Sequence, residues 1–184
     1  MNNIKKGNLL FAEPSMIGDI NFNRSVVLIA NHTKTGSVGF ILNKKLNYTS
    51  SELIPELKYD FSIYNGGPVE KENLYFIHCY PEIIPGSIKI KNNIYWGGDF
   101  SKIIELINND QIKESQIKFF LGYSGWEESQ LETEIGSSSW ILAENEINKN
   151  LVFNKVDNIW KEKLIDLGGK YLIWSNSPEN PNHN

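Results

Sequence analysis

The chain has 184 residues, with 18 Lys and Arg against 22 Asp and Glu, and a formal net charge of −4 at pH 7. Hydrophobic residues make up 40% of it and charged residues 22%, a balance that allows a packed core and excludes broad disorder. Direct binding to nucleic acid is disfavoured, because phosphate recognition needs clustered lysine and arginine and the basic residues here are scattered.

The cysteine content and the hydrophobic runs indicate where the protein is located. Cys79 is the single cysteine, which excludes an internal disulfide and a multi-cysteine metal centre. The first apolar run, residues 9–12, is too short for a signal peptide, and no run approaches the ~20 apolar residues that span a bilayer. We therefore expect a soluble cytoplasmic protein without membrane contact, with one domain over residues 1–175 and a disordered tail over 176–184.

Apolar and β-branched runs predict most of the strands. The runs at 9–12, 25–30, 38–42, 61–64, 74–79 and 140–143 each have the composition of a strand. Residues 25–30 and 38–42 are joined by a short polar loop and predict a hairpin. A second hairpin pairs 87–91 with 94–96 across Asn92 and Asn93, residues that tolerate a positive φ.

Capping residues and helical spacing predict three helices. Thr49 and Glu52 have capping-box spacing and start a short helix to Leu57, which Pro55 makes irregular. Asp99 is a suitable N-cap for a helix over 100–107, and a last helix over 155–167 closes the core. Residues 170–174 are read as either a final strand or a packed extension.

The stretch FFLGYSGWEESQLETE at residues 119–134 is the densest in motifs. The apolar run 117–121 predicts a strand, residues 122–126 a tight turn, and the following polar segment a helix that begins near Trp126. Such a junction would place backbone N–H groups at a helix N-terminus.

Eight segments resemble, in order and spacing, the AlgH/YqgE family of uncharacterised bacterial proteins. They are GNLLFAEPSM, FNRSVVLIANH, GSVGFILN, YNGGPVE, FIHC, IYWGGDF, FFLGYSGWEESQLETEI and SSSWIL. The resemblance implies a mixed α+β fold, in which a strongly bent, bifurcated and mainly antiparallel sheet forms a pseudo-barrel with helices packed around it. Members are often labelled transcriptional regulators, and the resemblance implies no catalytic residue and no cofactor. Two positions depart from the family pattern. Asn31 stands before His32, where the family often has an acidic residue, and Cys79 stands where serine is common.

Ser124 is the candidate nucleophile. Gly122 and Ser124 match the start of a G-x-S-x-G elbow, but Gly125 follows the serine directly and Trp126 occupies the final glycine position. A triad would also need His32 or His78 close by. The competing interpretation makes Ser124 the N-cap of the following helix.

Cysteine and histidine offer little further chemistry. His78 and Cys79 are neighbours on a predicted strand and point to opposite faces, so they do not pair, and Cys79 is interpreted as a small buried hydrophobe. His32, His78 and His183 lack the spacing of metal ligands, so we expect no metal and no cofactor.

Three glycine turns suggest a ligand site. If Gly66-Gly67, Gly97-Gly98 and Gly122 with Gly125 converge, their N–H groups would form an anion-receptive cleft walled by Trp96, Tyr123 and Trp126. The alternative is that the glycines only permit tight bends. Arg24 would neutralise a bound anion or pair with Asp19, and His32 is a further candidate ligand residue.

The sequence thus predicts a protein that binds a small anionic ligand or a protein partner without catalysis, with a regulatory role through protein contacts. The alternative is a serine-dependent hydrolase using Ser124. The sequence predicts no oligomeric state.

Overall fold

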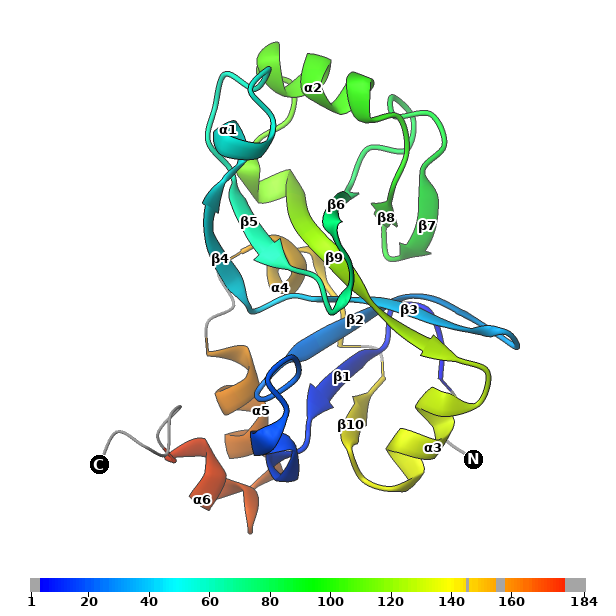
Figure 1. Cartoon of the computed structure of the whole chain (residues 1–184), viewed down its shortest axis with the longest axis vertical. Helices are drawn as coiled ribbons and strands as arrows, with labels where there is room; N and C mark the ends of the chain where they lie inside the picture. The colour runs from blue at the N-terminus through cyan, green and yellow to red at the C-terminus, as the bar shows by residue number, and fades with distance from the viewer. Residues whose placement is uncertain (1–3, 145, 155–157, 178–184) are drawn as a thin grey trace.

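A bent mixed sheet forms the centre of the protein (Figure 1). The structure is a computed structural model that describes residues 4–144, 146–154 and 158–177. Over these residues the sheet has ten strands, eight of them in the order β10-β1-β2-β3-β9-β6-β8-β7. The strands are β1 (Leu9–Ala12), β2 (Val26–Thr33), β3 (Gly36–Ile41), β4 (Lys45–Thr49), β5 (Ser62–Asn65), β6 (Val69–His78), β7 (Ile88–Lys91), β8 (Ile94–Trp96), β9 (Ile117–Glu127) and β10 (Trp140–Ala143).

The sheet divides at β9. β6 pairs with one edge of β9, while the other edge is shared between β5, which runs parallel to residues 119–121, and β3, which runs antiparallel to residues 124–127. β4 pairs in turn with β5. β7 and β10 end the described strand order, so the sheet bends without closing into a barrel. The predicted bent, bifurcated and mainly antiparallel α+β fold is confirmed.

Helices pack around the sheet at its two ends. In Figure 1, α1 and α2 lie at the top, α3 lies at the lower right beside β10, and α5 and α6 lie at the lower left. The helices are α1 (Ser50–Leu53), α2 (Phe100–Asn108), α3 (Gln130–Gly136), α4 (Lys149–Phe153), α5 (Ile159–Leu167) and α6 (Tyr171–Ser175), with 3-10 turns η1 (Pro14–Gly18) and η2 (Glu114–Gln116).

Local capping signals correctly predicted where their elements begin, although α1 ends at Leu53 and not at Leu57 as predicted. Asp99 accepts a hydrogen bond from the Lys102 N–H at 3.1 Å, and Thr49 with Glu52 forms the predicted capping box of α1. Asn92 and Asn93 both have positive φ in the β7–β8 turn. These signals act over three or four residues, so they do not depend on the rest of the fold.

Elements that depend on distant partners were predicted wrongly or missed. Residues 122–126 continue β9 and form no turn, and the next helix begins at Gln130 rather than near Trp126. β4 was not predicted, and residues 171–175, where either a final strand or a packed extension was expected, form the helix α6. Residues 155–157 of the predicted last helix, and 178–184 of the predicted disordered tail, lie outside the described residues. The domain boundary at residue 175 stays a prediction.

Three hydrophobic clusters make up the core, and β9 contributes to all of them. Phe120 of β9 belongs to the first cluster together with Phe40, Phe119 belongs to the second with Ile103, and Trp126 belongs to the third. Neighbouring residues on β9 enter different clusters because side chains on a strand alternate between its faces. β9 therefore joins the parts of the core.

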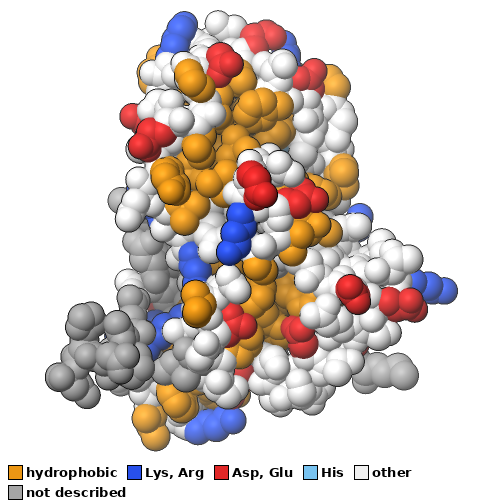
Figure 2. Space-filling model, viewed as in Figure 1, with side chains coloured by type: hydrophobic (Ala, Val, Ile, Leu, Met, Phe, Trp, Pro, Cys, Tyr) orange, Lys and Arg blue, Asp and Glu red, His pale blue; other side chains and the backbone are white. Residues whose placement is uncertain are grey.

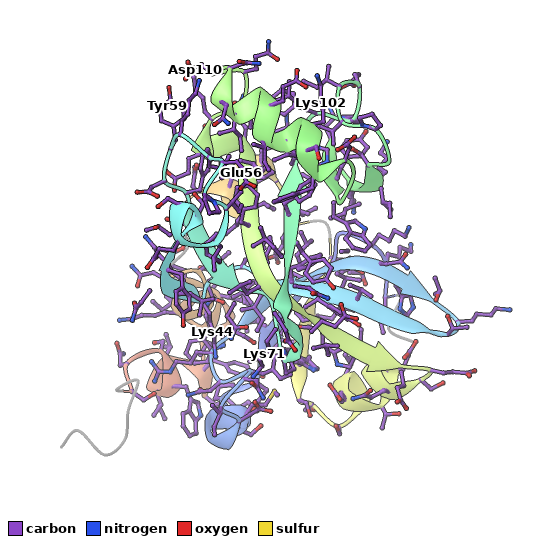
Figure 3. The ribbon with its side chains drawn as sticks, turned by 45° about the horizontal axis from the view of Figure 1, so that its top comes forward. Lys44, Glu56, Tyr59, Lys71, Lys102 and Asp110 are labelled. Atoms are coloured by element: carbon purple, nitrogen blue, oxygen red, sulfur yellow. The ribbon has the colours of Figure 1, made fainter. Side chains whose placement is uncertain are left out.

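The top of the molecule is held by contacts between α2 and the loop after α1. Asn108 accepts from the Lys58 N–H at 2.9 Å and donates to the Glu56 carbonyl at 2.8 Å. Tyr59 and Asp110 lie side by side there (Figure 3), and their hydrogen bond raises the pKa of Tyr59. Figure 2 shows hydrophobic side chains gathered over the upper half of the face that is seen in Figure 1.

No helix in the described part of the chain is long and apolar enough to cross a membrane.

Candidate functional site

A groove runs along the sheet where the ends of β3 and β9 meet the β2–β3 hairpin. It has a volume of about 520 Å³ and includes three of the residues predicted to form a ligand cleft, Tyr123, Gly125 and Trp126. We call it the β9 groove. Its lining residues are Asn31, Thr33, Thr35, Gly36, Ser37, Val38, Val69, Tyr123, Gly125, Trp126, Glu127 and Gln130.

Strand pairing explains the floor of the β9 groove. Val38 lies opposite Gly125 on one side and opposite Asn31 on the other, and residues paired across strands share a face of the sheet. A Cβ atom added to Gly125 would lie 3.2 Å from the Tyr123 ring and 3.5 Å from Val69. The missing side chain at position 125 therefore keeps the floor open between these two walls.

Two polar side chains in the groove are available to a ligand. Asn31 and Tyr123 are partly buried, and within the described residues neither the Asn31 carboxamide nor the Tyr123 hydroxyl has a hydrogen-bond partner. The Tyr123 ring is fixed edge-on against Tyr75, with ring centroids 5.6 Å apart. At the rim, the hydroxyls of Thr33 and Thr35 lie 3.0 Å apart. The groove thus offers an aromatic wall beside amide and hydroxyl groups.

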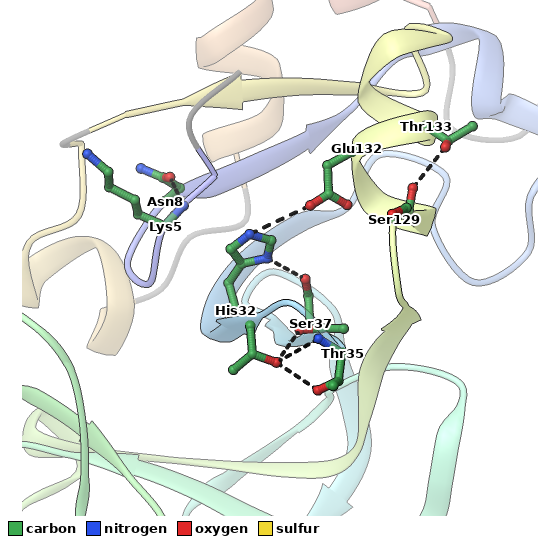
Figure 4. Close-up of polar contacts among 10 residues, drawn as sticks. Lys5, Asn8, His32, Thr35, Ser37, Ser129, Glu132 and Thr133 are labelled. Atoms are coloured by element: carbon green, nitrogen blue, oxygen red, sulfur yellow. Dashed lines mark hydrogen bonds and ion pairs between the residues drawn. The ribbon is translucent and has the colours of Figure 1, made fainter. Parts of the chain in front are cut away.

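His32 connects the hairpin to α3. Its Nδ1 lies 2.8 Å from the Ser37 hydroxyl, and its Nε2 lies 3.7 Å from a carboxylate oxygen of Glu132 (Figure 4). His32 alternates with the groove residue Asn31 along β2, so its ring is directed towards α3 and away from the groove floor. The structure gives His32 the role of a contact between elements.

Ser124 is neither on a nucleophile elbow nor at a helix N-terminus. It lies within β9, is fully buried, and donates a hydrogen bond to the Gly66 carbonyl at 3.0 Å. His32 and His78 make their hydrogen bonds to other groups. The predicted turn and the alternative N-cap role are therefore wrong, because the segment is a paired strand, and the Ser124 hydroxyl donates to a backbone carbonyl and not to either histidine.

Two of the three glycine turns meet, but they pack backbone against backbone. A Cβ atom at Gly66 would lie 2.1 Å from the Gly122 carbonyl oxygen, and one at Gly67 would lie 2.4 Å from the Ser124 nitrogen. The Gly66 N–H donates to the Leu121 carbonyl at 2.8 Å. The contacts leave no space for an anion between them, so the three-turn cleft predicted from the sequence is wrong.

The third turn, Gly97-Gly98, lies elsewhere. A Cβ atom at Gly98 would meet Ile84 at 2.7 Å and the Pro85 carbonyl oxygen at 3.0 Å. The Gly97 N–H donates to the Phe76 carbonyl at 3.0 Å. This turn therefore belongs to the packing of the β6–β7 connection.

Comparison with known proteins identifies the family. The AlgH-like family model matches residues 9–172. The chain belongs to the AlgH-like family. A UPF0301 protein of Bacteroides fragilis is 41% identical over all of this chain and 94% of its own length, and one of Cytophaga hutchinsonii is 39% identical over 98% of this chain and all of its own.

Two solved structures share the fold of this AlgH-like chain at 22% sequence identity. A crystal structure of a Corynebacterium diphtheriae protein has a TM-score of 0.75 and covers 96% of this chain and 94% of its own. The solution structure of AlgH from Pseudomonas aeruginosa has a TM-score of 0.73, with coverage of 97% and 96%. At this identity the likeness shows the fold alone.

His78 and Cys79 are structural residues in this AlgH-like chain. His78 is fully buried, its Nδ1 accepts from the Tyr80 N–H at 3.0 Å, and its Nε2 donates to the Gly97 carbonyl at 3.1 Å. Burial lowers the pKa of His78 and favours the neutral ring. Burial also raises the pKa of the Cys79 thiol, which favours the less reactive protonated form.

The two candidate tryptophans lie in different clusters. Trp96 packs against Phe40 in the first cluster with ring centroids 5.8 Å apart. Trp126 lies in the third cluster and donates through Nε1 to Glu134 at 2.8 Å, as Trp140 also does. Trp96 and Trp126 therefore do not face each other across one cleft, as the sequence had suggested.

Arg24 lies apart from the β9 groove. It donates through Nη2 to the Ser177 carbonyl at 2.8 Å, and its guanidinium carbon lies 5.2 Å from the centre of the Trp160 ring. The Asp19 carboxylate instead accepts from the N–H groups of Asn21 and Phe22, both at 2.8 Å.

Sequence reasoning missed several groove residues of this AlgH-like chain. Asn31, Val38 and Val69 were not proposed as ligand contacts. The predicted hairpin places Asn31 and Val38 on adjacent strands, but only the pairing of β3 with β9 brings them beside Gly125. That pairing joins segments about ninety residues apart, beyond the reach of a local pattern.

Proposed function

We propose that this AlgH-like chain is a non-catalytic binding protein whose β9 groove takes a small, neutral, polar molecule that contains a ring. The observation that carries the proposal is a pair of groups, the Asn31 carboxamide and the Tyr123 hydroxyl, that make no hydrogen bond within the described residues and lie beside the floor that Gly125 keeps open. Small-molecule sites combine such an aromatic wall with a few placed polar groups.

Charge argues for a neutral ligand in this groove. Glu127 is in the lining, and the described lining residues include no lysine or arginine. A carboxylate without a neighbouring cation repels an anion. The groove is therefore a poor site for the anionic ligand expected from the sequence. A nucleoside or a cyclic sugar, in contrast, has the ring face and the hydroxyl groups that this groove accommodates.

The proposal also includes a cellular role and a location for the protein. A part in transcriptional regulation comes from the family resemblance, and with a net charge of −4 it would run through protein contacts rather than through DNA. A cytoplasmic location is also proposed on the basis of the sequence. The hydrolase alternative has no support in the geometry, because Ser124 is buried and hydrogen-bonded to the backbone.

Ligand screening tests the proposal. Thermal-shift measurements against neutral nucleosides and monosaccharides should give hits, and NMR shift perturbation should place them at Asn31, Val38 and Tyr123. Gly125→Ala should abolish this binding, because the added methyl group enters the space between Tyr123 and Val69. Gly136→Ala is the matched control, since a Cβ atom there meets nothing within 4 Å.

Two results would contradict the proposal. One is the absence of any hit in the screen, and the other is a hit whose affinity is unchanged in Gly125→Ala while that variant stays folded.

A further inference from the structure

A second pocket lies between the start of β2, the end of β3 and the start of α5. It has a volume of about 330 Å³, within the range of small-molecule sites, roughly 300–1,000 Å³. We call it the Arg24 pocket. It is lined by Asn23, Arg24, Asn43, Lys44, Asn158, Trp160 and Lys161.

Positive charge sets the Arg24 pocket apart from the β9 groove. Arg24, Lys44 and Lys161 all line it, and its described lining contains no aspartate or glutamate. The remaining residues are three asparagines and one tryptophan, so the walls are polar and rich in hydrogen-bond donors. Cations gathered in a concave site focus a positive potential on its interior, and that potential attracts anions.

Lys44 contributes a half-buried cation. Its Nζ donates to the Asn21 carbonyl at 2.8 Å, and burial lowers the pKa of its ammonium group by more than the charge of the Asp19 carboxylate raises it. Figure 3 labels Lys44 near the start of β4, on the side of the molecule that faces α5. An ammonium group has three donors, and its burial is offset when an anion shares the site.

Arg24 is held in place before any ligand arrives. Its Nη2 donates to the Ser177 carbonyl and hydroxyl at 2.8 and 2.9 Å, and its guanidinium lies over the Trp160 ring. Its backbone has a φ of +56°, and the Asn43 side chain supports that conformation by donating to the Arg24 carbonyl at 2.9 Å. A fixed guanidinium loses less entropy when it binds an anion than a mobile one does.

Further donors come from Asn23 and Asn158. Within the described residues, neither carboxamide makes a hydrogen bond. Asn158 precedes the first residue of α5, and Lys161 lies in the first turn of that helix. Amide donors beside three cations suit the oxygens of a phosphate group, which accept several hydrogen bonds at once.

We propose that the Arg24 pocket is an anion site that binds a small phosphorylated molecule through Arg24, Lys44 and Lys161. The inference does not depend on the β9 groove, because the two sites share no residue. It assigns to Arg24 the anion contact that the sequence suggested, at a place away from the glycine turns.

Calorimetric titration with inorganic pyrophosphate, compared with inorganic phosphate, tests the site. Binding should be detectable for the full chain and should weaken as sodium chloride rises from low to physiological concentration. Lys44→Gln and Lys161→Gln should each weaken binding about fivefold or more, the scale of one lost charge contact. Lys89→Gln on β7 is the control with the same change in charge, and it should bind as the unchanged protein does.

Three outcomes would overturn the proposal. They are no detectable binding of pyrophosphate, equal affinity in Lys161→Gln and the unchanged protein, or an equal loss in Lys89→Gln, which would show a general charge effect. Lys161 is exposed, so its variant keeps the test valid even if Lys44→Gln does not fold.

Discussion

At the scale of the residue, Ser124 shows how a hydroxyl that resembles a nucleophile serves as a structural donor. It is fully buried and donates to the Gly66 carbonyl, which also accepts from the Ile41 N–H at 3.1 Å. The serine thereby links β9 to the turn before β6. A hydroxyl used in this way is not free to attack a substrate.

The replacement Ser124→Ala should cost about 1 kcal/mol of unfolding free energy, because one buried hydrogen bond is lost while the Gly66 carbonyl keeps its second partner. Urea unfolding measures this cost. Ser101→Ala on the exposed side of α2 is the control and should change stability by less than about 0.5 kcal/mol. A Ser124→Ala protein with unchanged stability would contradict the structural role.

At the scale of the element, β9 explains which parts of the fold the sequence could predict. Nine of the ten strands that the structure describes and the helix α2 were anticipated, at least in part, because apolar runs and the Asp99 cap are local signals. The pattern G-Y-S-G-W has the composition of a turn, yet its residues pair with β3 and β6. Tertiary pairing overrides a local preference here, and the same cause hid the groove.

Gly122 is the residue that misled the turn prediction. Its φ is +69°, and a Cβ atom there would lie 2.7 Å from the carbonyl oxygens of both Gly67 and Val69. Gly97 has nearly the same φ, +68°, but a Cβ atom there meets nothing within 4 Å. The two glycines therefore separate the cost of backbone strain from the cost of a steric clash.

We expect Gly97→Ala to lower the free energy of unfolding by about 1 to 2 kcal/mol, which is the strain of a left-handed backbone conformation in a residue with a side chain. Gly122→Ala should cost more than about 3 kcal/mol, since two backbone oxygens must also move. Chemical unfolding of both variants in parallel makes the comparison. Equal costs would show that β9 and the start of β6 do not approach as closely as the structure has them.

At the scale of the whole molecule, the two ends of the chain meet at α5. Trp160 is buried in the first cluster, and its Nε1 donates to the Ala12 carbonyl of β1 at 2.7 Å, across 148 residues of sequence. Its ring also lies beneath Arg24. The sequence predicted that this helix closes the core, but the shared role of its tryptophan in a charged pocket depends on contacts that no local pattern encodes.

Trp160 therefore links the stability of the fold to the proposed anion site, and two substitutions separate these roles. Trp160→Phe keeps an aromatic ring beneath Arg24, so the affinity for pyrophosphate should be kept. It leaves the buried Ala12 carbonyl without its donor, so it should lower the free energy of unfolding by about 1 to 3 kcal/mol. Trp160→Ala should lower the free energy of unfolding by about 3 to 5 kcal/mol, because it leaves a cavity. It should also weaken pyrophosphate binding, because Arg24 loses the ring beneath it. Urea unfolding and calorimetry on the same samples measure both effects, with the exposed Leu167→Ala in α5 as the control. If Trp160→Phe unfolds as the unchanged protein does, the hydrogen bond to β1 does not hold α5 in place.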